Sequence, residues 1–342
     1  MLSGNRFEVL YKTAVVTGGS RGLGLAVGRQ LAEKGANVVI VARDGQRLTE
    51  GLKHVQEGAL HPETQRFLQI SADLTLAAES VRVIDEVVTW NRGPPDIVWC
   101  CAGTSHPTMF IDTPVSQLEA QMNSNYFTSA YMAHAVLNSW LRTSREKTAE
   151  PASPASQTGV AKSPKMTPRH LIFTSSLAAF FSLAGYGPYT PSKSALRGLS
   201  DTLSQEMELY AAAHPNEPPV RLHTIFPSTI LGEALDTENL IKSDLTKMLE
   251  EGEGGQTSEV IASKAIKGLQ GGEELIMTDF TGTLLRRTVT GSTSRGLLTI
   301  LGDFILAGIL TLVVAFVRAD MDSKVRKFGR KFGDSGMKAE RN

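Results

Sequence analysis

Residues Thr13–Gly24 read TAVVTGGSRGLG, and this stretch decides the fold. The β-branched and small apolar residues at Thr13–Thr17 predict a short buried strand. The glycines that follow predict a tight turn, and residues Leu25–Lys34, closed by Gly35, predict a helix. In such a unit, glycines let the backbone approach a pyrophosphate, and the helix N-terminus offers free N–H groups. The start of the chain therefore predicts a nucleotide-binding turn.

Two other motifs compete for the same residues. Residues Gly18–Gly22 also fit G-x-S-x-G, the nucleophile elbow of hydrolases, but that elbow normally follows several strands and only one precedes it here. A P-loop needs Gly-Lys followed by Ser or Thr, whereas Gly24 is followed by Leu25. We therefore retain the dinucleotide interpretation.

Six further apolar runs predict strands buried on both faces, as in a parallel sheet covered by helices. A helix is predicted at Val115–Leu141, and residues 227–255 are predicted to form a mixed, mainly helical segment that covers a site. We therefore expect an α/β domain over residues 1–280, built on a doubly wound, seven-stranded parallel sheet with helices on both faces. The six strands are expected at Asn37–Ala42, Phe67–Ala72, Asp96–Cys101, His170–Thr174, Val220–Phe226 and Glu274–Thr278.

Composition narrows the possible partners and the compartment. The 342 residues contain 35 Lys and Arg and 35 Asp and Glu, so charge gives no sign of a nucleic acid partner. The two cysteines, Cys100 and Cys101, are adjacent on a predicted strand, where neighbours point to opposite faces. We interpret them as core residues in a reducing compartment. Residues 1–12 are polar and show no signal sequence.

An arginine follows the second predicted strand, where NAD-binding folds place an acid on the ribose hydroxyl. Arg43 is a planar donor suited to a 2′-phosphate, and Arg47 and Arg21 add charge to the same patch. This arrangement predicts NADPH rather than NADH as the cofactor. The alternative is that these are solvated surface arginines, and Asp44 is more simply a helix N-cap.

A second cluster of polar residues predicts the chemistry. Ser175 and Ser176 follow the run His170–Thr174, and Tyr189 and Lys193 share one face if the residues from Tyr189 onward are helical. An ammonium beside a phenol lowers the pKa of the tyrosine, and a serine hydroxyl can hydrogen-bond the carbonyl oxygen that the tyrosine protonates. The pattern predicts acid catalysis at a ketone, with no metal and no covalent nucleophile. Either serine can face the substrate.

Three other segments carry separate predictions. Asn125, inside a predicted helix, is either a satisfied core amide or part of a proton path. Residues Thr143–Pro168 contain four prolines among polar residues and predict a disordered surface insertion. Residues Leu297–Val317 are apolar except for Asp303, long enough to cross a bilayer core of about 30 Å. Residues 281–342 are therefore predicted to bind membrane lipid through 297–317.

Two topologies remain open for this segment. A single span would send the basic tail Arg318–Lys331 into the lumen, against the positive-inside tendency. A re-entrant or in-plane segment, bent at Gly302 or Gly308, would leave the tail in the cytosol on anionic lipid.

These motifs, taken together, resemble those of the short-chain dehydrogenase/reductases over about residues 12–278. More narrowly, the Gly-Gly-Ser-x-Gly-Leu-Gly turn, the Cys-Cys-Ala-Gly segment, the Met-x-x-Asn-Tyr helix and the C-terminal apolar segment resemble the fungal 3-ketodihydrosphingosine reductases of the endoplasmic reticulum. The residues that carry the family resemblance are Thr17-Gly18-x-x-x-Gly22-x-Gly24, Asp73, Asn125, Ser176 and Tyr189-x-x-x-Lys193.

The resemblance implies a role for each matching residue. Tyr189 would protonate the ketone, and Lys193 would lower the pKa of Tyr189 and hold the nicotinamide ribose. Asn125 would anchor a proton-relay water. Ser176, or Ser175, would polarise the substrate oxygen. The expected cofactor-binding residues are Gly18, Ser20, Arg21, Gly22, Gly24, Arg43, Arg47, Asp73, Leu74, Gly103, Tyr189 and Lys193. Two departures from the family pattern are Cys100-Cys101 in place of Asn-Asn and Pro227-Ser228 in place of Pro-Gly.

The leading hypothesis is an NADPH-dependent reductase of 3-ketodihydrosphingosine, a long-chain amphiphile, at the endoplasmic reticulum membrane with its catalytic domain in the cytosol. A second hypothesis keeps the chemistry but changes the substrate to a steroid, retinoid or fatty-acyl ketone. A third is a catalytically silent, NADP-binding membrane scaffold. A homo-oligomer is expected only by analogy with the fold.

Overall fold

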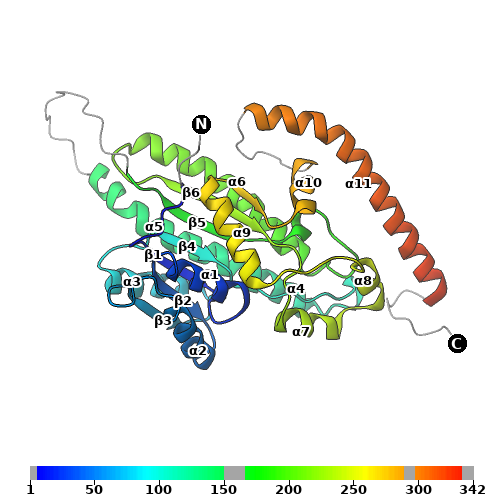
Figure 1. Ribbon diagram of the computed structural model, residues 1–342, viewed down its shortest axis with the longest axis horizontal. Helices are drawn as coiled ribbons and strands as arrows, with labels where there is room; N and C mark the ends of the chain where they lie inside the picture. Colours follow the sequence, from blue (N-terminus) through cyan, green and yellow to red (C-terminus); the bar gives the residue numbers. More distant parts are fainter. Residues whose placement is uncertain (1–5, 150–165, 289–296, 333–342) are drawn as a thin grey trace.

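A seven-stranded sheet forms the centre of the molecule in the computed structural model, which describes residues 6–149, 166–288 and 297–332 (Figure 1). All its paired strands are parallel, and their order is β3-β2-β1-β4-β5-β6-β7. The predicted doubly wound α/β fold is confirmed. The strands are β1 (Thr13–Thr17), β2 (Asn37–Ala42), β3 (Phe67–Ser71), β4 (Ile97–Cys100), β5 (Arg169–Thr174), β6 (Val220–Phe226) and β7 (Leu275–Met277).

Helices cover both faces of the sheet with two separate apolar layers. One layer packs α3 (Ala77–Asn91), α5 (Thr128–Ala149) and α6 (Thr190–Ala213) against the strands, around residues such as Met132 and Phe173. The other layer packs α1 (Gly22–Ala32), α2 (Gly45–Gln56) and α9 (Ser258–Gly271), around residues such as Leu31 and Trp99. Because both faces are covered, the strands are mainly apolar, which is why the sequence showed them so clearly.

The strand order reverses between β1 and β4, and the carboxyl ends of the strands at this point open onto a cleft. The helix α1 begins at Gly22, earlier than the predicted Leu25, so its N-terminus lies directly in the glycine turn. Gly35, with φ of 87°, closes the segment after this helix as predicted.

The predicted single helix from Val115 to Leu141 is wrong in its detail. A short α4 (Val115–Gln121) is followed by one π-helical segment (Met122–Phe127) and then by α5, which continues to Ala149. A π-helical turn inserts an extra residue into the helical ladder and commonly marks a functional position. Here it contains Asn125.

The start of the predicted insertion at Thr143 is also wrong. Residues 143–149 continue α5, because Arg, Glu, Lys and Ala favour a helix and the first helix-breaking residue is Pro151. Met166–Pro168 lead directly into β5, and the rest of the predicted insertion lies outside the described residues.

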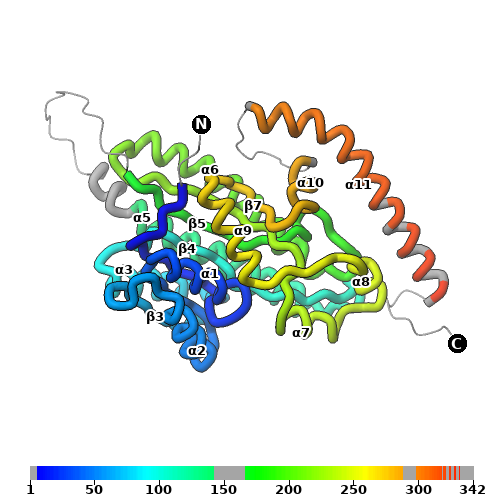
Figure 2. The backbone as a smooth tube through the Cα atoms, in the orientation of Figure 1, coloured from blue at the N-terminus to red at the C-terminus, as the bar shows by residue number. Residues whose placement is uncertain are grey.

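The C-terminal part of the described chain is helical. After α10 (Phe280–Thr288), a helix of 36 residues, α11 (Leu297–Phe332), runs along one flank of the domain past α10 and α8 (Asp244–Leu249) (Figures 1 and 2). Both Gly302 and Gly308 lie inside this helix, so the predicted re-entrant bend is wrong. Leu, Ile and Ala surround the two glycines and no proline interrupts the segment, so the helix continues through them.

Candidate active site

A cavity of about 990 Å³ opens at the carboxyl ends of the strands, and every residue that the sequence predicted for the site lines it. They come from the segments after β1, β2, β3, β4 and β5, from the π-helical segment, and from the start of α6. The doubly wound topology explains this convergence, because parallel strands that are far apart in sequence end at the same edge of the sheet.

Tyr189 and Lys193 lie one turn apart at the start of α6, as predicted. Tyr189 is the residue before the helix, and Pro191 lies in its first turn, where a missing N–H costs nothing. The Lys193 ammonium lies 5.6 Å from the centre of the Tyr189 ring, is almost fully buried, and donates to the carbonyl oxygen of Thr174 at 3.0 Å. The end of β5 therefore holds this lysine in the cavity.

The two serines have different surroundings. The Ser175 hydroxyl is buried and donates to the backbone carbonyl oxygen of Lys193 at 2.7 Å, so it fastens α6 to the end of β5. The Ser176 hydroxyl is hydrogen-bonded to Tyr189 and accepts from the N–H of Ala178 at 3.2 Å. This geometry places Ser176, not Ser175, beside the phenol.

Burial sets the protonation of the two central groups. It raises the pKa of Tyr189 above its ordinary value of 10.0, and the hydrogen bond from Ser176 opposes this shift. Burial also lowers the pKa of Lys193 to about 8. The direction for Tyr189 is opposite to the one predicted from its pairing with Lys193, because desolvation of the buried phenol is the larger effect. At neutral pH the phenol keeps its proton, as a proton donor must.

Asn125 is fully buried, and its amide is satisfied by the loop after β4. Its oxygen accepts from the N–H of Thr104 at 3.0 Å, and its nitrogen donates to the carbonyl oxygen of Thr104 at 2.9 Å. A Cβ atom added at Gly103 would lie 2.5 Å from the Asn125 oxygen and 3.2 Å from the Lys193 nitrogen. Asn125 and Lys193 therefore converge on Gly103. The first sequence alternative for Asn125, a satisfied core amide, is confirmed, and its part in a proton path stays a prediction.

A second tyrosine lines the cavity, and sequence reasoning missed it. The Tyr186 ring centre lies 5.9 Å from that of Tyr189, but its hydroxyl donates to the carboxylate of Glu250. Burial and this carboxylate raise the pKa of Tyr186. Glu250 also pairs with the buried Lys242 at 2.8 Å. Tyr186 is thus committed to a structural network, which leaves Tyr189 as the cavity tyrosine beside a serine and a lysine.

The glycine turn fits a pyrophosphate. Gly18 and Gly22 have φ of 66° and 54°, which L side chains rarely adopt. A Cβ atom at Gly18 would lie 2.9 Å from the backbone of Ala102, whereas nothing lies within 4 Å of one at Gly22, which faces the open cavity. Arg21 precedes α1 without capping it through its side chain, so the first N–H groups of the helix remain available to an anion.

The part of the cavity predicted to bind the adenosine carries the predicted polar residues and Thr75, which was not predicted. Asp73 accepts from the Thr75 hydroxyl at 2.8 Å, which holds the pKa of this carboxyl below its ordinary value, and nearby Arg43 acts in the same direction. Arg43 is exposed and lines the cavity, as does the buried Leu74. Arg47 instead makes two hydrogen bonds to Glu233, at 3.0 and 3.1 Å.

Glu233 begins the helix α7 (Glu233–Ile241), which lies in the predicted covering segment, and it also pairs with Arg21 at 3.4 Å. One carboxylate therefore connects this helix to two of the three arginines predicted for a phosphate. The contact spans 186 residues to Arg47, so no local sequence signal marks it.

The sequence interpretation of the cysteines as core residues is confirmed for Cys100 but is wrong for Cys101, which is half-buried and lines the cavity because β4 ends there. Cys100 is buried, and burial raises the pKa of the Cys101 thiol to about 12. The Cys101 sulfur accepts from the Thr174 hydroxyl at 3.5 Å. Among the described residues, no group of three or more His, Cys, Asp or Glu side chains is arranged to hold a metal ion.

Comparison with known proteins agrees with this geometry. A model of the family described as short chain dehydrogenase matches residues 12–168. The 3-ketodihydrosphingosine reductase ksrA of Aspergillus fumigatus is 45% identical over 337 residues, which cover 96% of this chain and 88% of the relative. The 3-ketodihydrosphingosine reductase gsl-3 of Neurospora crassa is 37% identical over 333 residues, which cover 97% of this chain and 86% of that protein.

Solved structures share the fold. A short chain dehydrogenase/reductase from Burkholderia phymatum, in complex with NAD, aligns with a TM-score of 0.65 over 82% of this chain and 94% of that chain, at 15% sequence identity. Because the similarity to the Aspergillus protein extends over nearly the whole length of both sequences, the chain belongs to the short-chain dehydrogenase/reductase family.

Proposed function

We propose that this protein reduces the 3-keto group of 3-ketodihydrosphingosine to the secondary alcohol of dihydrosphingosine, with NADPH as reductant. The observation that carries the proposal is the placement of Ser176, Tyr189 and Lys193 in one cavity that is also lined by the apolar helix α11. The similarity to two fungal 3-ketodihydrosphingosine reductases over almost the full chain supports this substrate.

Bound NADPH supplies the hydride that the carbonyl carbon receives. Tyr189 donates the proton that the carbonyl oxygen takes up, so that one hydride and one proton convert the ketone to an alcohol. Ser176, hydrogen-bonded to Tyr189, directs its hydroxyl to the same oxygen. Lys193 places a positive charge beside the phenolate that forms, and Asn125, which converges with it on Gly103, belongs to the path that returns a proton to Tyr189.

The charges along the cavity suit a cationic amphiphile. Besides the residues proposed for the cofactor, the cavity is lined by Glu238, Glu250 and Glu253, with Lys242 as the cation among them. 3-Ketodihydrosphingosine carries an amino group next to its ketone, and a protonated amine is favoured beside carboxylates. Steroid, retinoid and fatty-acyl ketones lack this cation, which makes them the second candidate class.

Arg43 is proposed to select NADPH by binding its 2′-phosphate. Replacing Arg43 with Ala removes a charge-assisted hydrogen bond worth roughly 1.5–3 kcal/mol, so the preference for NADPH over NADH should fall about tenfold to a hundredfold. Isothermal titration with each nucleotide measures the ratio. Arg221→Ala is the matched control, because Arg221 lies at the start of β6, at the edge of the sheet away from the cavity. An unchanged ratio in Arg43→Ala would reduce Arg43 to a surface residue.

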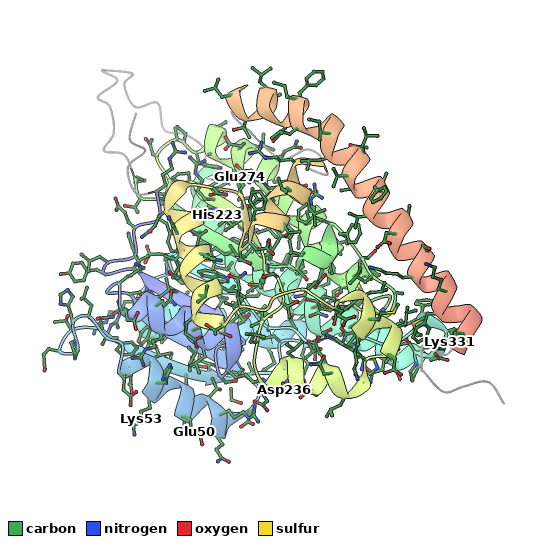
Figure 3. All side chains as sticks on the ribbon, turned by 45° about the vertical axis from the view of Figure 1, so that its right-hand side comes forward. Glu50, Lys53, His223, Asp236, Glu274 and Lys331 are labelled. Carbon is green, nitrogen blue, oxygen red and sulfur yellow. The ribbon has the colours of Figure 1, made fainter. Side chains whose placement is uncertain are left out.

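Glu233 is expected to compete with the phosphate for Arg47 and Arg21. Glu233→Gln should therefore strengthen NADPH binding by about twofold to fivefold, the range for one exposed ion pair, and change NADH binding less. Asp236→Asn, on the same helix (Figure 3), makes the same change in charge and should leave both affinities unchanged. Weaker NADPH binding in Glu233→Gln would mean that the carboxylate supports the site instead.

The helix α11 is proposed to lie in the plane of the endoplasmic reticulum membrane, with the catalytic domain in the cytosol. Its segment Leu298–Val317 has a mean hydropathy of 2.5 and is only 6% buried, although it is long enough to span a bilayer. Contacts at both ends hold it along the domain, and Asp303, inside the apolar segment, pairs with Arg287 of α10, so a perpendicular span would carry charged α10 residues such as Arg286 into hydrocarbon. A lumenal tail in protease-protection mapping would contradict this orientation.

The test of the proposed function is a panel of ketones. The full-length protein in phospholipid vesicles is incubated with NADPH and one test compound at a time. The compounds are 3-ketodihydrosphingosine, a steroid ketone, a retinoid aldehyde and a 3-ketoacyl ester. We expect NADPH oxidation to be fastest with 3-ketodihydrosphingosine. Faster reduction of another compound would transfer the function to that class, and oxidation with none would favour the silent scaffold.

A further inference from the structure

The helix α11 is fastened to the catalytic domain at two widely separated points. Near its start, Asp303 is buried and accepts a hydrogen bond from the Arg287 guanidinium of α10 at 2.8 Å. Near its end, Phe328 is buried against Leu245 and Leu249 of α8. At about 1.5 Å per residue, these two anchors are roughly 37 Å apart along the helix.

Between the anchors, one face of α11 turns towards the cavity that holds Tyr189. Leu310, Val313, Val314 and Val317 line this cavity together with Leu284 and Leu285 of α10. From Asp303, the residues Leu310, Val314, Val317 and Phe328 follow at steps of seven, four, three and eleven. With about 3.6 residues per turn, these steps keep all five within roughly 60° of one another. The anchors and the cavity-lining residues therefore share one inner face.

The opposite face of α11 is equally apolar, but it is exposed. Ile305, Ile309, Leu312 and Phe316 are 62%, 61%, 74% and 77% exposed, respectively. A helix that is apolar all round is expected inside a core or in lipid, not in water. Because the inner face borders the cavity and the outer-face side chains named above are exposed within the described part of the chain, the two faces serve different partners.

The geometry points to a second role for this helix: its inner face is the wall along which the hydrocarbon chain of the substrate lies during reduction. The ketone would reach Tyr189 while the chain extends along Leu310, Val314 and Val317. The membrane anchor would then be part of the substrate site, and the chain would pass from lipid into the cavity beneath α11. This inference rests on the proposed function and adds specific chain-binding residues to it.

The first test compares chain lengths. Val314→Trp places a large side chain on the inner face, and Leu312→Trp introduces the same side chain on the outer face. Each full-length variant is assayed with 3-ketodihydrosphingosine in vesicles and with a soluble analogue that lacks roughly ten methylene groups. We expect Val314→Trp to lower kcat/KM for the long ketone at least about tenfold and for the short one less than about threefold. Leu312→Trp should change neither.

The outcomes separate the two proposals. If the wild-type protein reduced neither ketone, the proposed function would fail. If it reduced both and Val314→Trp affected them equally, or neither, the function would stand and the role of the inner wall would be overturned.

A second test does not depend on turnover. Cys100 is buried, and the half-buried Cys101, which lines the cavity, has a thiol pKa raised to about 12, so the reaction of a cysteine introduced on α11 is measured as the excess over that of the wild-type protein. Dihydrosphingosine added to vesicles should slow the reaction of Val314→Cys with an uncharged maleimide at least about fivefold and leave Leu312→Cys within about twofold. Equal protection of both positions, or of neither, would overturn the inference.

Discussion

Replacing Tyr189 with Phe is expected to reduce kcat by about 10²- to 10⁴-fold, the range for loss of a positioned general acid. The hydroxyl is the only group lost, and the ring that lines the cavity remains. NADPH affinity should therefore stay within about twofold of wild type, which fluorescence titration measures. Activity within about tenfold of wild type, a loss below ~1.4 kcal/mol in barrier, would remove Tyr189 from its role as the acid.

Tyr186→Phe is the matched control for this prediction. It removes the same atom from a tyrosine in the same cavity, but from one whose hydroxyl donates to Glu250. We expect a lower thermal stability, because Glu250 loses a buried partner, and a kcat within about tenfold of wild type. A larger loss of kcat in Tyr186→Phe than in Tyr189→Phe would show that Tyr186, and not Tyr189, is the acid.

Replacing Lys193 with Met is expected to damage both chemistry and cofactor binding. The ammonium lies beside the phenol and lines the part of the cavity proposed for the nicotinamide ribose. We expect kcat to fall at least about 10²-fold and NADPH affinity to fall about tenfold, the loss of one hydrogen bond to a charged group. Loss of kcat with unchanged affinity would leave Lys193 acting on the phenol alone.

The same variant should change how stability depends on pH. The pKa of Lys193 is lowered to about 8 in the folded protein, against 10.5 for an ordinary lysine. Below pH 8 the lysine is charged in both states, and its burial destabilises the fold in full. As pH rises from 8 to 10.5 the folded form loses its proton first, so this cost disappears. The stability of wild type relative to Lys193→Met should therefore rise across this window, as denaturant unfolding at several pH values would show.

Local signals were sufficient to predict the sheet and most of the site. The bounds of β1, β2 and β6 agree with prediction because a strand covered on both faces is mainly apolar, and these three are followed by Gly18, Arg43 and Pro227, respectively. Every predicted site residue lines one cavity because the parallel strands before them end at the same edge. These conclusions need only the order of elements along the chain.

The remaining features depend on contacts that are distant in sequence. The π-helical turn at Asn125 accompanies its bonds to the backbone of Thr104, on a different element. The choice between Ser175 and Ser176 depends on how α6 docks against β5. The ion pair between Glu233 and Arg47 requires that α7 fold back over the cleft. Local propensity contains none of this information.

The docking of α11 is an intermediate case. The sequence predicted an apolar segment, but hydropathy alone could not distinguish a free span from a helix held along the domain. The spacing of Asp303, Leu310, Val314 and Phe328 on one face was a signal, since a charge inside an apolar segment normally faces a protein partner. That partner, Arg287, became apparent only from the fold.

The most direct test of the proposed reaction follows the hydride itself. Full-length protein in vesicles is incubated with 3-ketodihydrosphingosine and NADPH that carries deuterium at C4 of the nicotinamide, in separate reactions with each C4 epimer, and the product is analysed by mass spectrometry. With one of the two epimers, we predict dihydrosphingosine that contains a single deuterium at C3, and none of this product from Tyr189→Phe within the same time. Dihydrosphingosine without deuterium from both epimers, or no dihydrosphingosine at all, would contradict the proposed function.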